Sequence, residues 1–236
     1  MKDIFRFKQF DVNQSGCTMK INTDGVLLAV SAEQKQAHRI LDIGTGTGVI
    51  ALMLAQRFPE AIVEAIDIDQ GAVQCAAENF RNSPFADRLS VQYTGIGEFG
   101  SKHRFDLIVS NPPFFLNSLK NPGEKKSLSR HGSVEFFKQL FRKAEQLLTP
   151  SGSFQIIWPL SSRDQIISMG IHGNLSLHHE RLVSSFPQGE PFRTISTFKA
   201  GPDSSNYSKD DFPIYERQGV YTEAYNNLLS PFFIKF

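Results

Sequence analysis

A short apolar run that ends in an acid and three alternating glycines constrains this chain more than any other feature. Residues 39–43, Arg-Ile-Leu-Asp-Ile, are too few for a helix and predict a buried parallel strand. Residues 44–48, Gly-Thr-Gly-Thr-Gly, let the backbone turn sharply and let a ligand approach closely. Residues 49–58 then have a helical pattern that Pro59 ends. A glycine loop between a strand and a helix N-terminus predicts a nucleotide-type binding site.

The spacing of this loop distinguishes among nucleotide-like ligands. Dinucleotide sites carry G-x-G-x-x-G, whereas this loop reads Asp-x-Gly-x-Gly-x-Gly, with Val49 at the place of the last fingerprint glycine. A second predicted strand, residues 62–67, ends in Asp67, where an acid bonds ribose hydroxyls in such folds. Asp42, which the dinucleotide pattern lacks, is placed to hold an ammonium group. The combination resembles the S-adenosylmethionine (SAM) site of class I methyltransferases. The alternatives are a glycine-rich turn without a ligand and a dinucleotide site.

The rest of the chain predicts a single α/β domain over residues 1–236, in which residues 1–38 form an N-terminal extension or lid. Strands that alternate with helical patterns imply right-handed crossovers and a mostly parallel sheet. The resemblance implies a Rossmann-like class I methyltransferase fold with seven strands, the last one antiparallel. The segments expected as strands are 39–43, 62–67, 89–93, 105–110, 153–158, 175–186 and 192–199. The segments expected as helices are 23–30, 49–58, 70–82, 134–148, 163–169 and 223–229.

Local signals also predict where some of these elements begin. Thr23 or Asp24 can cap the first helix, Ser133 the fourth and Thr222 the last. Residues 1–22 are expected to form a small β-like lid, and residues 201–211 are the segment expected to be a flexible loop.

Charge and cysteine content bound the function more loosely. The formal net charge of +1 gives no argument for a nucleic-acid partner. Cys17 and Cys75 form neither a metal spacing nor a disulfide framework, which fits a reducing compartment. His178 and His179 lack further ligands, so no metal is expected. No apolar run approaches membrane-spanning length, so a cytoplasmic protein without a membrane partner is expected. The sequence predicts no particular oligomeric state.

Asn111-Pro112-Pro113-Phe114 directly follows the predicted strand 105–110. Ligands of open α/β sheets bind beyond the carboxyl ends of the strands, so this loop should face the glycine loop. The Asn111 side-chain oxygen and the Pro112 carbonyl can each accept one N–H of a planar amine and direct its lone pair toward a methyl donor. The prolines restrict the backbone, and Phe114 offers a face for a flipped base. The alternative is a proline turn with Phe114 in the core.

The two loops together resemble the amino-methyltransferases with an Asn/Asp-Pro-Pro-aromatic signature, which act on adenine, cytosine or glutamine amide nitrogens. Phe-Lys-Gln-Phe at residues 7–10, Met-Lys-Ile-Asn-Thr-Asp-Gly-Val-Leu-Leu at 19–28 and Tyr-Thr-Glu-Ala-Tyr at 221–225 extend the resemblance over nearly the whole chain. With them, the chain resembles the bacterial valine-tRNA adenine-N6 methyltransferases, which modify the adenosine at position 37 beside the anticodon. The resemblance implies SAM as cofactor, tRNA as substrate and residues 111–114 as the catalytic loop. A protein glutamine-N5 methyltransferase is the alternative.

The candidate cofactor contacts follow from the loop and from the resemblance. They are Asp42, Gly44, Gly46, Gly48, Asp67, Ile68, Lys20 and Thr23. The last two are expected to close over the cofactor, although helix capping is an equal alternative for Thr23. The family usually carries an Asp after the third strand to bond the adenine amino group, and Gly95 stands there in this chain. Glu98 or a backbone carbonyl would then replace that contact.

The candidate substrate contacts are Lys125, Lys126 and Arg130, which follow the catalytic loop in a locally basic stretch. Such residues can bind the phosphates of tRNA, and a solvated charged loop is the alternative.

Overall fold

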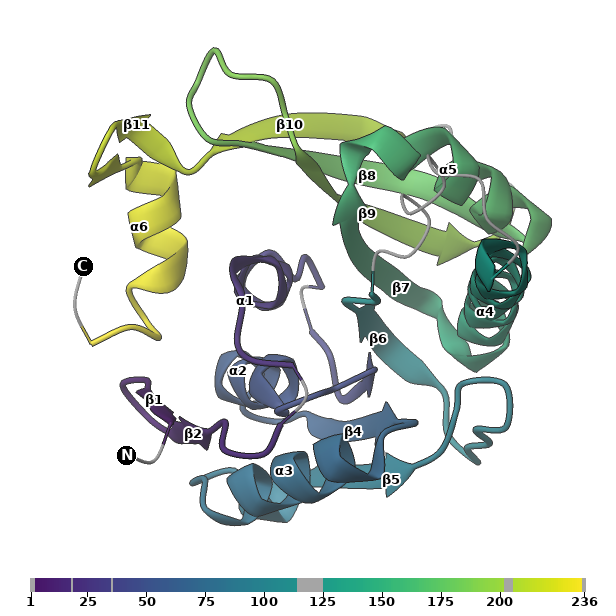
Figure 1. Ribbon diagram of the computed structural model, residues 1–236, viewed down its shortest axis with the longest axis horizontal. Coiled ribbons are helices and arrows are strands. Elements are labelled where there is room, and N and C mark those ends of the chain that lie inside the picture. Colours follow the sequence, from purple (N-terminus) through teal and green to yellow (C-terminus); the bar gives the residue numbers. More distant parts are fainter. Residues whose placement is uncertain (1–2, 18, 35, 114–124, 202–205, 235–236) are drawn as a thin grey trace.

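An eight-stranded sheet runs through the protein, in the order β10-β8-β9-β7-β6-β3-β4-β5 (Figure 1). The computed structural model describes residues 3–17, 19–34, 36–113, 125–201 and 206–234, with the backbone alone for 125–133. Within the sheet only β9 runs against its neighbours. The strands are β3 (Arg39–Ile43), β4 (Ile62–Asp67), β5 (Leu89–Tyr93), β6 (Phe105–Ser110), β7 (Leu148–Pro159), β8 (Leu175–Ser184), β9 (Arg193–Ala200) and β10 (Ser208–Pro213).

Helices cover both faces of this sheet. They are α1 (Thr23–Val30), α2 (Val49–Arg57), α3 (Gln70–Arg81), α4 (Lys125–Leu147), α5 (Arg163–His172) and α6 (Glu223–Leu229), with short 3₁₀ turns at Ala86–Arg88 and Leu160–Ser162. Two small hairpins, β1 (Ile4–Arg6) with β2 (Asp11–Asn13) and β11 (Tyr215–Arg217) with β12 (Val220–Tyr221), lie outside the main sheet. Among the described residues, no helix is both long and apolar enough to cross a membrane.

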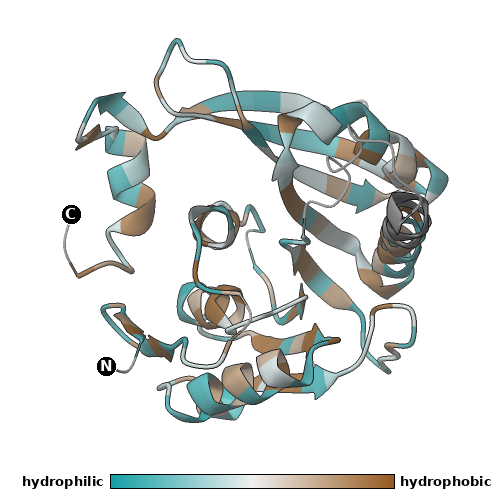
Figure 2. Ribbon diagram, in the orientation of Figure 1, coloured by the Kyte–Doolittle hydropathy of each residue, from teal (hydrophilic) through white to brown (hydrophobic). Residues whose placement is uncertain are grey.

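The sheet separates two hydrophobic cores. Alternate side chains of a strand point to opposite faces, so Ile40 and Leu107 join one core while Leu41 and Ile108 join the other. Residues of α1, α2, α3 and α6 pack in the first core, and residues of α4 and α5 pack in the second. Figure 2 shows hydrophobic colour along β4 and β6 and more hydrophilic colour over β8 and β10. Because helices cover the central strands on both faces, the strand ends are where a ligand can reach them.

This architecture confirms the predicted Rossmann-like α/β fold, including the antiparallel strand β9. The expected strand count of seven is wrong, because β10 adds an eighth strand parallel to β8. That strand begins within residues 201–211, the segment expected to be a flexible loop, and ends at Pro213. Its Ser-Lys-Asp-Asp-Phe-Pro sequence lacks the apolar alternation of a strand. It forms at the sheet edge because β8 offers a pairing partner.

The N-terminal extension is a hairpin that the C-terminal segment holds in place, in agreement with the β structure expected there. Phe7 forms a β-bridge with Phe233. The Lys8 ammonium donates a hydrogen bond to the Ser230 carbonyl at 2.6 Å. The Phe7 ring stacks on Phe10 with centroids 4.6 Å apart. The N-terminal hairpin is therefore joined to the segment that follows α6, and Figure 1 shows β1 and β2 at the lower left.

Cys17 and Cys75 form a disulfide bond across 58 residues of sequence. The expectation of no disulfide is wrong, because the segment after β2 packs on α3 and brings the two side chains together. The spacing of two cysteines in the sequence carries no signal of such a contact. The bond attaches the lid segment to α3, and the cysteine content no longer argues for a reducing compartment.

The start of α1 differs from the prediction by one residue. Its N-cap is Asn22, whose side-chain oxygen accepts a hydrogen bond from the Gly25 N–H at 2.9 Å. Thr23 is the first helical residue and Asp24 lies in the first turn, so neither caps the helix. Asn caps a helix as well as Asp or Ser does, and Asn22 stands one residue before the predicted Thr23. At α6 the predicted cap is confirmed: the Thr222 hydroxyl accepts from the Tyr225 N–H.

α4 begins nine residues before the expected start at Val134, at Lys125. The expected cap at Ser133 is wrong, since that residue lies inside the helix. Residues 125–133 are mostly polar and lack the apolar periodicity that located the rest of the helix. Lys125, Lys126 and Arg130 therefore belong to the first turns of a helix rather than to a loop.

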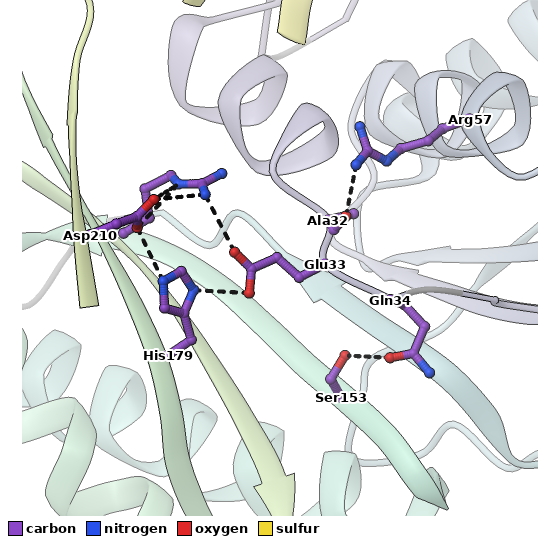
Figure 3. Close-up of polar contacts among 8 residues, drawn as sticks. Ala32, Glu33, Gln34, Arg57, Ser153, His179 and Asp210 are labelled. Carbon is purple, nitrogen blue, oxygen red and sulfur yellow. Dashed lines mark hydrogen bonds and ion pairs between the residues drawn. The ribbon is translucent and has the colours of Figure 1, made fainter. Parts of the chain in front are cut away.

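A cluster of charged side chains joins the segment after α1 to strands β8 and β10 at the sheet edge (Figure 3). The Nδ1 atom of His179 on β8 lies 2.9 Å from the Glu33 carboxylate, and its Nε2 lies 3.1 Å from Asp210 on β10. Arg181 also binds both carboxylates. Since each ring nitrogen faces an acceptor, the imidazolium is favoured. The hydrogen bond to Glu33 raises the pKa of His179 above its ordinary value of 6.5, although burial opposes the shift.

This arrangement makes part of the folding stability depend on pH. Because the pKa of His179 is raised in the folded protein, its contribution is fully present below pH 6.5 and is lost as pH rises through the folded value. We expect the free energy of unfolding of wild type to exceed that of His179→Gln most at pH 5.5, with the gap narrowing toward pH 8.5 in urea titrations. His178→Gln is the matched control. A gap that stays constant with pH would contradict this assignment.

Candidate active site

The glycine loop is anchored to the end of β4. The N–H groups of Gly44 and Thr45 both donate to the Ile66 carbonyl, at 2.9 and 3.1 Å. The Gly46 N–H donates to one carboxylate oxygen of Asp67 at 2.9 Å, and the other oxygen accepts from the Asp69 N–H at 2.9 Å. Asp67 therefore joins the glycine loop to the turn that starts α3. The sequence predicted Asp67 as a ligand contact but not this second role.

A pocket of about 750 Å³ opens at this edge of the sheet. Its walls come from the lid segment, the glycine loop, the turns after β4 and β5, the turn after β6, and α4. Eight of the residues predicted for the site line it. They are Lys20, Gly44, Gly46, Asp67, Ile68, Asn111, Pro112 and Pro113. The crossover topology thus brings residues that are up to 93 positions apart in the sequence to one cavity.

Three of the other predicted residues that the structure describes lie outside the pocket wall. Thr23, Asp42 and Gly48 do not line the pocket. Phe114 lies outside the described residues, and so does the rest of the segment as far as 124. The described part of the chain contains no group of three His, Cys, Asp or Glu side chains that could hold a metal ion.

Asp42 lies beneath the glycine loop and is fully buried. Its Oδ2 accepts a hydrogen bond from the Thr45 hydroxyl at 2.7 Å, while no described residue donates to its Oδ1. Burial raises the pKa of Asp42 to about 7, with the Thr45 hydrogen bond opposing the shift and the Asp67 charge adding to it. The carboxyl therefore supports the loop from below, and its contact with a ligand ammonium stays a prediction.

Gly48 serves the packing of two helices. It caps α2 with φ +81°, and a Cβ there would lie 2.5 Å from Cε1 of Phe80 and 3.2 Å from Cβ of Ala76, both on α3. Gly46 also has positive φ, +56°, but a Cβ there would meet no atom within 4 Å and would enter the open pocket. The loop thus needs its glycines for two different reasons.

Asn79 connects the lid to the glycine loop, a role that no sequence pattern indicated. This α3 side chain is 2% exposed. Its amide nitrogen donates to the carbonyls of Thr47 and Asn13, at 2.9 and 3.1 Å, and its oxygen accepts from the Asn13 N–H at 2.8 Å. Gln14, next along the lid, accepts from the Ile21 N–H at 2.7 Å. These bonds attach the segment that leads to the pocket-lining residues 19–22 to α3 and to the glycine loop.

The turn after β6 places Asn111 at the pocket wall, beside the start of α1. The Asn111 amide nitrogen lies 3.4 Å from the side-chain oxygen of Asn22, which also lines the pocket. Pro112 is buried and Pro113 is exposed. Phe136 and Gln139 of α4 complete this side of the pocket, and no sequence pattern indicated that this part of α4 would form a pocket wall.

Two isoleucines contribute apolar surface to the pocket. Ile68 is 73% exposed, unusual for an isoleucine, and lines the pocket together with the buried Ile96. Gly95, which also lines the pocket, has a carbonyl that already accepts the N–H groups of Glu98 and Phe99. Apolar side chains such as these two isoleucines can pack against a flat ring.

Comparison with known proteins identifies the family. A family model described as methyltransferase small domain matches residues 17–166. A relative from Pedobacter heparinus, named tRNA1(Val) (adenine(37)-N6)-methyltransferase, is 43% identical over 236 residues, covering 100% of both chains. A relative of the same name from Phocaeicola vulgatus is 41% identical, covering 98% of this chain and 97% of the relative. The chain belongs to this methyltransferase family.

A structural comparison bears on the fold alone. The solved structure of a predicted O-methyltransferase, protein Atu636 from Agrobacterium tumefaciens, aligns with a TM-score of 0.69 and 20% identity, covering 89% of this chain and 96% of that chain. At that identity the likeness shows a shared methyltransferase fold. The segment matched by the family model contains the end of the lid, the glycine loop and the Asn-Pro-Pro turn, so every described loop of the methyltransferase pocket falls within it.

Alanine substitutions distinguish the packing role of Gly48 from the ligand-binding role of Gly46 in this methyltransferase. Gly48→Ala should lose about 1–2 kcal/mol of stability from the left-handed backbone and roughly 1–3 kcal/mol more from overpacking against Phe80. Gly46→Ala should lose only the backbone part, but its Cβ should weaken SAM binding. Urea unfolding and titration calorimetry measure the two effects. Equal losses of stability in the two variants, or unchanged SAM affinity in Gly46→Ala, would refute this division.

Proposed function

We propose that this protein transfers the methyl group of SAM to N6 of an adenosine in tRNA, at position 37 of a valine tRNA. The observation that carries the proposal is the position of Asn111 and Pro112 in the same pocket as the glycine loop. Relatives about 40% identical over nearly their whole length carry this activity in their names. The tRNA they act on supports the cytoplasm as the proposed location.

The residues of the pocket fit SAM. Bound SAM supplies an electrophilic methyl group. Asp67 lies at the wall where its carboxylate can accept from ribose hydroxyls while it keeps its bonds to the loop. Ile68 and Ile96 would flank the adenine ring. The Gly95 carbonyl is already occupied by two N–H donors, so we assign the contact to the adenine amino group to the Glu98 side chain, which lines the pocket.

Two acceptors in the Asn-Pro-Pro turn orient the substrate. The lone pair of an adenine amine is delocalised into the ring, which makes the nitrogen a poor nucleophile. The side-chain oxygen of Asn111 and the carbonyl of Pro112 would each accept one N–H bond and hold the nitrogen toward the methyl group. Because the two prolines restrict the backbone, this turn loses little conformational entropy when the substrate binds. Phe114 remains the proposed stacking face for the base.

Lys125, Lys126 and Arg130 are proposed to bind tRNA phosphates. They occupy the first turns of α4, whose later residues Phe136 and Gln139 line the pocket. A helix that enters the active site carries its N-terminal turns to the neighbourhood of the bound substrate. The positive end of a helix dipole also favours phosphate.

The proposed activity is tested by incubating the protein with labelled SAM and unmodified valine tRNA, followed by nucleoside analysis. We expect label in N6-methyladenosine, and none when the tRNA carries guanosine at position 37. Label in a glutamine-bearing protein but not in tRNA would contradict the proposal and support a glutamine-N5 methyltransferase.

Asn111→Ala should lower turnover of valine tRNA by roughly 10²-fold, by analogy with the loss of one preorganised polar group from an active site. SAM affinity measured by calorimetry should stay close to wild type, because this side chain acts on the substrate amine. Asn227→Ala, an exposed asparagine on α6, is the matched control. Turnover of Asn111→Ala equal to that of the control would remove Asn111 from the mechanism.

Replacement of Lys125, Lys126 and Arg130 by Ala should weaken tRNA binding and make the slope of log K against log salt shallower by about 0.7–0.9 per lost phosphate contact. SAM affinity should not change. The matched control replaces three exposed cations on β9, β10 and β11, Lys199, Lys209 and Arg217, by Ala. Identical salt slopes for the two triple variants would exclude the start of α4 from the RNA-binding surface.

A further inference from the structure

The start of α1 touches the proposed catalytic asparagine directly. The Oδ1 atom of Asn22 accepts two hydrogen bonds, from the Gly25 N–H at 2.9 Å and from the Asn111 amide nitrogen at 3.4 Å. A Cβ added at Gly25 would also lie 3.4 Å from that nitrogen. The first turn of α1 and the turn after β6 are therefore in contact, although 89 residues separate Asn22 from Asn111.

The chemistry of these bonds determines which way the Asn111 amide faces. A backbone N–H can only donate, so the Asn22 atom that caps α1 must be its oxygen. The Asn111 atom that faces this oxygen must then be a donor, which is its NH₂ group. With the nitrogen held by Asn22, the Asn111 oxygen is the atom that remains for a ligand. In the opposite orientation two oxygens would meet, and Asn111 would offer N–H groups to an amine that itself needs acceptors.

Asn22 is held in place from both sides. On the lid side, the N–H of the preceding residue, Ile21, donates to the Gln14 side chain at 2.7 Å. On the helix side, Asp24 forms an ion pair with Arg193 at the start of β9, 2.8 Å between Nε and Oδ2. These side chains are 15% and 25% exposed, so the pair is largely shielded from water. The helix start is thus fixed to the lid and to the sheet.

We propose that Asn22 is a positioning residue that orients the side-chain amide of Asn111, so that the Asn111 oxygen faces the substrate amine. This inference rests on the proposed function, because the orientation matters only when Asn111 accepts an N–H bond from the substrate. It also gives the cap of α1 a second role. The Gly25 N–H fixes the position of the Asn22 oxygen, and that oxygen in turn orients the Asn111 amide in the catalytic turn.

Two substitutions separate this role from capping. Asn22→Ser keeps a good helix cap, but its shorter side chain cannot reach Asn111. Asn22→Asp keeps both the cap and an acceptor for Asn111. We expect the kcat of Asn22→Ser with valine tRNA to fall about tenfold, the effect of losing one ordinary hydrogen bond, with the KM for SAM and the melting temperature unchanged. The kcat of Asn22→Asp should stay close to that of the wild-type protein.

Thr222→Ser is the control for a cap exchange away from the pocket, at the start of α6. It should change neither kcat nor the melting temperature. A kcat of Asn22→Ser within twofold of wild type would overturn the proposal. Equal losses in Asn22→Ser and Asn22→Asp would overturn it as well, because they would show a requirement for Asn22 that is unrelated to its acceptor.

A measurement without turnover keeps this test separate from the proposed function. In NMR spectra the side-chain NH₂ of Asn111, assigned through its loss in Asn111→Ala, should exchange slowly with water in wild type and in Asn22→Asp. It should exchange faster in Asn22→Ser. If exchange follows this order but no variant methylates valine tRNA, the proposed function fails while the contact stands. Equal exchange rates in all three proteins would contradict the contact itself.

Discussion

The pairing of β3 between β4 and β6 is the constraint on which the site depends. All three strands run in the same direction, so their carboxyl ends lie at one edge of the sheet. The chain leaves them at Gly44, Ile68 and Asn111, and each of these residues lines the same pocket. The strands are buried on both faces, so each of the loops that follow starts from a packed strand end. Cofactor and substrate groups are thereby held on one framework.

The remaining wall of the pocket depends on contacts between distant parts of the chain. Asn79 bonds both the lid and the glycine loop, so one buried amide holds the two segments that would enclose the cofactor. The disulfide between Cys17 and Cys75 and the bridge between Phe7 and Phe233 attach the lid at two further places. A buried amide without partners would cost about 1–3 kcal/mol, which favours the docked lid.

Local patterns predicted much of the fold and part of the site. The bounds expected for β4, β5 and β6 agree with the structure, because an apolar run and its flanking turns are local signals. Most of the predicted cofactor contacts line the pocket, as do Asn111 and its two prolines. Asn22 and Gln139 had no such signal. An isolated polar residue at a helix start or on a helix face looks the same in sequence whether it faces solvent or a ligand.

The sequence by itself determined the order of the elements, the glycine loop and the turn that carries the chemistry, because glycine spacing, proline and apolar periodicity act over a few residues. Only the tertiary structure decided that Asp42 lies under the loop, that Gly48 packs on α3, that two cysteines pair and that β10 joins the sheet. Each of these outcomes depends on which surfaces meet when strands and helices pack. A residue's neighbours along the chain do not specify that.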